Sequence, residues 1–120
     1  MKKTRTITVG NRLSQKYLEP AVGREISGLE FSLAPNYPNP FNPSTKIIYT
    51  IPETGRVSFT VYDISGRIVS TIVDRVQSRG RYTVEWNGCD KRGIQVAGGI
   101  YFGVLRAGKN MQKIKMVLNK

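Results

Sequence analysis

The chain has 120 residues, a formal net charge of +11, no histidine and a single cysteine, Cys89. This length suits one domain that removes roughly two-thirds of its extended-chain surface from water, so a core forms without a metal or a disulfide. The lack of histidine excludes Ser-His-Asp and Cys-His catalysis, together with every zinc site that uses imidazole.

Residues 1–30 are polar and charged and follow neither the period of a strand nor that of a helix. We interpret them as an extension or the remnant of a linker, and residues 31–120 as the folded domain. The basic start, Met1 to Gly10, is similar to the first part of a signal peptide but lacks the apolar core of about 7–15 residues. We therefore expect no signal peptide in this chain. No apolar run approaches the ~18 residues of a transmembrane helix, so we expect no membrane-spanning segment.

A stiff loop is predicted for Pro35 to Ser44, which contains four of the six prolines. Proline lacks the backbone donor and biases the preceding residue toward extended conformations, so this segment cannot be a helix. A short edge strand, residues 31–34, leads into it. We expect the aromatic side chains of Tyr37 and Phe41 to anchor the loop against the domain. A peptide-docking groove built on the same two rings is the alternative.

Beyond Ser44 the apolar residues alternate with polar ones, which is typical of half-buried strands. Alternation predicts strands at 45–51, 56–63, 68–73 and 82–86, a strand containing Ile100, Phe102 and Val104, and a last strand containing Ile114, Met116 and Leu118. Turn residues separate them at intervals of ~8–12 residues, and this spacing indicates an all-β sandwich of about seven antiparallel strands. The core is expected to include Tyr49, Phe59, Val61, Val84, Trp86 and Leu118, with Trp86 as its central side chain.

The polar loop residues have simple structural explanations. Asp63 and Asp90 precede glycines in turn-forming segments, where Asx-turn hydrogen bonds are expected; a weak Ca²⁺ site is the alternative. Cys89 has no histidine to activate it as a nucleophile, although Lys91 and Arg92 lie next to it in the sequence. We interpret it as unreactive, and we expect no cofactor.

The positive charge is spread over the chain, with 19 Lys and Arg against eight acids. Its only local concentrations are the extreme N-terminus and the last strand with its tail. We interpret most of it as a solvated surface, with a specific polyanion site as the alternative. The sequence lacks the basic stripe with interleaved aromatic residues that is typical of strand-face nucleic-acid binders, so we expect no specific nucleic-acid binding.

Several segments are specific enough to indicate a family. They are Asn36 to Ile47 (NYPNPFNPSTKI), Val61 to Arg67 (VYDISGR), Gly80 to Gly88 (GRYTVEWNG), Asp90 to Gly93 (DKRG), Ala97 to Phe102 (AGGIYF) and the ending Lys113 to Lys120 (KIKMVLNK). In this order and spacing, they closely resemble the C-terminal sorting domain, type A, of the type IX (Por) secretion system. That family overlaps in sequence with the Ig-like domain of the flagellar hook-capping protein.

The resemblance implies an immunoglobulin-like fold, no catalysis, and a role as the sorting signal of a larger secreted protein. The implied partners are a cargo domain upstream in cis, the outer-membrane translocon and a surface sortase. The implied location is the cell surface or the medium, reached through the periplasm. Recognition is implied at Gly99, Tyr101, Lys113, Lys115 and Lys120. Lysines on an outer strand also discourage edge-to-edge pairing, which is the alternative explanation for them.

The chain departs from the family in that only about 30 residues precede the motifs and no signal peptide is visible. We interpret it as an excised domain, a truncated cargo protein or a short orphan reading frame, and we expect a monomer. Three functions follow in order of preference. They are a secretion-sorting module, an Ig-like adhesion or assembly module of hook-capping type, and a basic nucleic-acid-binding domain.

Overall fold

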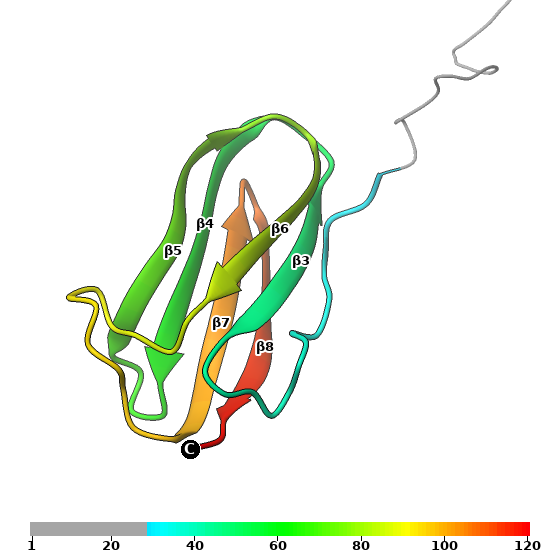
Figure 1. Cartoon of the computed structure of the whole chain (residues 1–120). Helices are drawn as coiled ribbons and strands as arrows, with labels where there is room; N and C mark the ends of the chain where they lie inside the picture. Colours follow the sequence, from blue (N-terminus) through cyan, green and yellow to red (C-terminus); the bar gives the residue numbers. More distant parts are fainter. Residues whose placement is uncertain (1–28) are drawn as a thin grey trace, which may run out of the picture.

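A computed structural model of the chain describes residues 29–120, which form two antiparallel sheets packed face to face (Figure 1). The strands are β2 (Ser32–Leu33), β3 (Thr45–Ile51), β4 (Gly55–Asp63), β5 (Ile68–Gln77), β6 (Gly80–Trp86), β7 (Gly99–Ala107) and β8 (Asn110–Leu118). One sheet has the order β2-β3-β6 and the other β5-β4-β7-β8. The predicted sandwich of about seven strands is confirmed. The interpretation of residues 1–30 as an extension falls, apart from the last two of these residues, outside the described part of the chain.

The core lies between β3 of the smaller sheet and β4 and β7 of the larger one. Strand β3 contributes Ile47, Tyr49 and Ile51, and β4 contributes Val57, Phe59 and Val61, all of them fully buried. Both sets occupy alternate positions, so each strand presents one complete face to the other sheet. The buried hydroxyl of Tyr49 donates a hydrogen bond of 2.7 Å to Oε1 of Gln77 at the end of β5.

Trp86 ends β6 and is 1% exposed. Its ring lies 5.5 Å from that of Phe41 in the proline-rich loop and 5.2 Å from that of Tyr101 on β7, with both pairs tilted or edge-on. The indole Nε1 donates a hydrogen bond of 2.9 Å to the carbonyl of Cys89 in the next turn. This aromatic cluster therefore joins a loop, both sheets and a turn, and the role predicted for Trp86 is confirmed.

Two side chains are more exposed than the sequence predicted. Tyr37 is 80% exposed rather than packed on the domain. Its backbone pairs with that of Lys46, and because opposed residues share a face of a sheet, Tyr37 points to solvent on the same side as the exposed Lys46. Val84 is half-buried rather than buried, since it lies on the edge strand β6 and has a neighbouring strand on one side only. Phe41, Tyr49, Phe59, Val61, Trp86 and Leu118 are buried as expected.

The strands are also longer than the sequence indicated. Strand β5 continues to Gln77 because Asp74 and Val76 remain paired with β4. On β7, Tyr101, Leu105 and Ala107 face the core, while Ile100 and Phe102 of the alternate set lie on the outer face of the sheet and are only partly covered.

Asp63 and Asp90 close their turns with Asx-type hydrogen bonds, as predicted. Asp63 Oδ1 accepts bonds from the backbone N–H and hydroxyl of Ser65 and from the N–H of Arg67. The hydroxyl of Ser65 contributes most to lowering the pKa of Asp63, which falls to about 2. Asp90 makes the same kind of contacts: the N–H of Ile94 contributes most to lowering its pKa, and the N–H of Arg92 adds to the effect.

We expect Asp63 to stabilise the fold in a pH-dependent way. Its folded pKa of about 2 lies below the ~3.9 of an unfolded chain. The stabilisation is therefore fully present above about pH 4 and is lost as the pH falls through about 2. Asp63→Asn should reduce the free energy of unfolding at about pH 6, and urea titrations should show the difference from wild type shrinking toward about pH 2. A difference that stays constant over this range contradicts the assignment.

Trp86→Ala should lower the free energy of unfolding by about 3–5 kcal/mol, because it removes a fully buried aromatic side chain and leaves a cavity between two other rings. Trp86→Phe keeps an aromatic ring but loses the indole N–H, which leaves the carbonyl of Cys89 without its hydrogen-bond donor. This loss alone should lower the free energy of unfolding by about 1–3 kcal/mol. Guanidinium unfolding followed by circular dichroism measures both values. An alanine variant that costs no more than the phenylalanine variant contradicts the central packing role.

Candidate functional site

The last strand, β8, forms one edge of the four-stranded sheet and pairs with β7 along its whole length. Its side chains alternate as predicted: Met116 and Leu118 are buried and Ile114 is half-buried, while Lys113 and Lys115 lie on the exposed outer face. Lys113 Nζ lies 5.6 Å from the centre of the Phe102 ring on β7, so the ammonium group contacts an aromatic face.

The proline-rich loop covers the C-terminal half of the free edge of β8, and Figure 1 shows it beside the end of that strand. Asn39 makes two contacts: its Oδ1 accepts a bond of 3.0 Å from the N–H of Val117, and its Nδ2 donates one of 3.3 Å to the carbonyl of Lys115. The N–H of Phe41 donates to the carbonyl of Val117 at 2.9 Å, and the N–H of Asn119 donates to the carbonyl of Phe41 at 2.8 Å. The loop thus replaces a neighbouring strand there.

Gly99 and Tyr101 begin β7 and pair with Leu118 and Met116. Gly99 has a φ of 148° and borders a shallow depression of about 360 Å³ shared with Ile64 and Ile100. Tyr101, in contrast, is only 7% exposed, packs on Trp86 and donates its hydroxyl to the carbonyl of Ala97. Burial is the main reason why the pKa of Tyr101 is raised.

The five residues implied by the resemblance do not form one compact cluster. Lys120 lies over Gly98, the residue before Gly99, at the end of the sandwich: a Cβ added to Gly98 would lie 3.3 Å from the Cβ of Lys120. Lys113 lies seven positions before Lys120, and at ~3.3 Å per residue this places it roughly 20 Å further along the strand. The set therefore forms a stripe along β8, with Tyr101 beneath it.

Strands β7 and β8 and the residues that follow them carry positive charge and no negative charge. The sequence from Gly99 to Lys120 contains Arg106, Lys109, Lys113, Lys115 and Lys120 but no acid. Within residues 29–120 the ion pairs are Arg56–Asp74, Arg67–Asp63 and Arg92–Asp90, all on other elements. No acid in the described part of the chain neutralises the lysines of β8.

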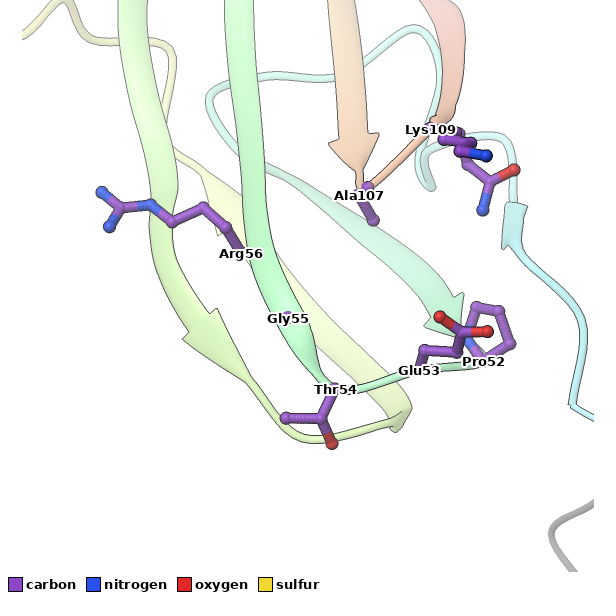
Figure 2. A pocket seen from close by; sticks show the side chains of 9 residues that line it. Pro52, Glu53, Thr54, Gly55, Arg56, Ala107 and Lys109 are labelled. Atoms are coloured by element: carbon purple, nitrogen blue, oxygen red, sulfur yellow. The ribbon is translucent and has the colours of Figure 1, made fainter.

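A larger cavity, of about 470 Å³, lies at the opposite end of the sandwich, between the β3–β4 and β7–β8 turns (Figure 2). Its polar side chains do not converge: the Arg56 side chain points away from Glu53 and Lys109 and pairs with Asp74. In the described residues, moreover, no three His, Cys, Asp or Glu side chains are grouped closely enough to hold a metal ion. No helix found there has the length and apolar character that a membrane crossing requires.

The sequence did not indicate the role of Asn39, because its partners follow 76 and 78 residues later. The run of Asn-Pro pairs predicted turns, but only the tertiary structure shows that one of these asparagines binds β8. Phe41, predicted as an anchor, also pairs through its backbone with the same strand.

Asn39→Ala should increase the hydrogen-exchange rate of the Val117 amide by about tenfold, because it removes one hydrogen bond of roughly 1–1.5 kcal/mol. Met116, whose backbone pairs with Tyr101 on β7, is an internal control and should keep its protection. Asn39→Asp retains the acceptor oxygen and should protect Val117 nearly as well as wild type. Equal exchange of Val117 in the alanine variant and the wild type would show that the loop does not cap this edge.

Comparisons with known proteins place the domain in a family. The family model of the FlgD Ig-like domain matches residues 44–109, more than half of the chain. A search of the curated proteins finds no match.

Solved structures share the fold at low sequence identity. PorZ of Porphyromonas gingivalis, described as an essential surface component of the type IX secretion system, matches with a TM-score of 0.51 and 22% identity over 80% of this chain. Dimeric latent PorU from the same organism matches with a TM-score of 0.54 and 16% identity over 85%. The flagellar hook-capping protein FlgD of Xanthomonas campestris matches with a TM-score of 0.51 and 22% identity over 77%.

The chain spans only 12% of PorZ and 10% of PorU, but 68% of that FlgD chain. The immunoglobulin-like character of the sandwich is thus confirmed. With a match over more than half of its length, the chain belongs to the FlgD Ig-like domain family.

Proposed function

We propose that residues 31–120 form a non-catalytic sorting module, which directs a cargo protein attached upstream to the translocon of a type IX secretion system and on to the cell surface. Recognition takes place along β8, through Lys113, Lys115 and Lys120. Gly99 and Tyr101 act by holding the neighbouring strand in place. A surface sortase is the second partner, and the domain works as a monomer.

One observation carries this proposal. The two segments with the most specific resemblance to type IX sorting domains, the proline-asparagine loop and the basic C-terminal strand, are hydrogen-bonded to each other. Asn39 and Phe41 fix the register of Lys115 to Asn119 through four bonds. A translocon that acts on folded domains requires a rigid, distinctive surface, and the loop supplies that rigidity next to the chain terminus. The likeness to PorZ supports the same secretion system.

An Ig-like assembly module of hook-capping type is the second candidate. Membership of the FlgD Ig-like family favours it directly. Such a module would use the same rigid sandwich to hold protein subunits together and would need no cationic terminal strand. The two functions therefore differ in what they require of the β8 lysines.

A signal peptide and a fluorescent reporter fused ahead of Phe31 should reach the cell surface in a type IX-competent host. Lys113, Lys115 and Lys120 changed together to Gln should leave the fold intact, because all three side chains are exposed. Charge-assisted contacts contribute about 1.5–3 kcal/mol each, so surface delivery should fall by about tenfold or more, with the reporter retained in the periplasm. Surface proteolysis and cell fractionation measure the distribution.

A matched control changes three exposed cations elsewhere, Lys46, Arg81 and Lys91, to Gln. It alters the net charge equally and should be exported normally. Undiminished delivery of the β8 variant removes these lysines from the recognition surface, and equal loss in the control shows that net charge alone matters. Retention of the unmodified fusion in the periplasm contradicts the sorting function and favours the assembly module.

A further inference from the structure

The free edge of β8 is divided into a capped half and an open half. The loop bonds show that the backbone groups of Lys115, Val117 and Asn119 point away from β7, toward the loop. Backbone direction alternates along an antiparallel strand, so the groups of Met111 and Lys113 point to the same free side. Within residues 29–120 no backbone hydrogen bond reaches them there. Strand β2, which also contacts β8, is hydrogen-bonded to β3 in the other sheet and not to β8.

We propose that this open half, Asn110 to Ile114, binds an extended acidic segment of a partner protein as an additional strand. The inference deepens the proposed function and rests on it, since it names the kind of partner that the β8 lysines recognise. Main-chain hydrogen bonds to Met111 and Lys113 supply the docking, and side chains at alternate positions supply the selectivity.

Charge selects the occupant. A strand added beside β8 places alternate side chains on the outer face, next to Lys113 and Lys115, where opposite charges stabilise a cross-strand pair and like charges destabilise it. Arg106, on β7, adds a further cation to the same face. A second copy of this chain, paired through its own β8, would bring lysines against lysines. The lysines thus oppose self-association and favour a strand with Asp or Glu at alternate positions.

The intervening positions of the added strand face inward, beside the half-buried Ile114. That neighbour favours an apolar residue between the acids. The preferred segment therefore alternates acidic and apolar residues over about four or five positions, matching the open length of the edge.

The other long edges fit such a segment less well. Strand β5 has two register irregularities with β4, which twist an edge and weaken pairing, and the N–H of Lys91 already occupies the carbonyl of Val69. Strand β6 carries both Arg81 and Glu85 on its exposed face, so it offers no preference for either sign of charge. The open half of β8 combines a regular ladder with one sign of charge.

The test uses the full chain and blocked peptides of about ten residues, long enough for one strand. The first alternates Glu with Val and Thr, the second replaces each Glu by Lys, and the third is the Glu peptide with alternate backbone nitrogens methylated. A thymidine oligonucleotide of matched charge is the fourth probe. Anisotropy titration gives the affinities, and NMR hydrogen exchange reports the amides of Met111 and Lys113.

The Glu peptide should bind at least about tenfold more tightly than each of the other three probes. It should also slow exchange at Met111 and Lys113 while leaving Val117, which is already capped, unchanged. Lys113→Glu with Lys115→Glu should reverse the preference toward the Lys peptide, whereas Lys46→Glu with Lys91→Glu should not.

Equal binding of the methylated peptide would reduce the interaction to charge attraction and overturn the strand-addition proposal. Binding of the oligonucleotide as tight as that of the Glu peptide would overturn it in favour of a general polyanion surface. Absence of protection at Met111 and Lys113 overturns it as well. If the peptides fail while export still depends on the β8 lysines, this inference is wrong and the sorting function stands. If the Glu peptide binds as expected while export does not depend on the β8 lysines, the strand-addition inference stands and the sorting function is wrong.

Discussion

The packing of three aromatic rings, Phe41, Trp86 and Tyr101, is the constraint on which the rest of the structure depends. Their contacts of 5.2 and 5.5 Å bring the proline-rich loop against the end of β6 and the start of β7. Once Phe41 is buried there, its own backbone lies opposite Val117 and Asn119, so ring packing and strand capping are one event. Aromatic pairs of this geometry add about 0.5–1.5 kcal/mol beyond the area that they bury. Loss of the cluster would release the loop, the Cys89 turn and the end of β8 together.

This arrangement makes β8 part of the folded core. Met116 and Leu118 are buried, and Leu118 lies beside Phe41 and beneath the turn at Gly88. The outward lysines between them are consequently held in a fixed register, although their side chains are free in solvent. Rigid backbone with mobile charge is a suitable combination for a recognition surface, because little backbone entropy remains to be lost on binding. A flexible segment of the same composition would lack that advantage.

The sequence predicted what depends on local periodicity and missed what depends on distant contacts. Strand β3, the buried face of β4 and the outward lysines of β8 follow from alternation alone, and Trp86 follows from its place at the end of an alternating strand. Tyr37 was misplaced because its orientation is set by pairing with Lys46, and Val84 because its strand lies at an edge. The cap supplied by Asn39 was invisible for the same reason, since it joins residues 76 and 78 positions apart.

Charge placement also shows why a net charge is a poor guide to function. Within residues 29–120 the acids that form ion pairs are Asp63, Asp74 and Asp90. Asp63 and Asp90 pair with arginines in their own turns, and Asp74 on β5 pairs with Arg56 on β4. Two of the three also close turns through backbone N–H groups. Each of these acids is paired with an arginine outside β7 and β8, so the cations of β7 and β8 remain unopposed and give this part of the surface a positive field. The core residues determine a fold that many proteins share, whereas the edge strand and its charges determine which partner binds.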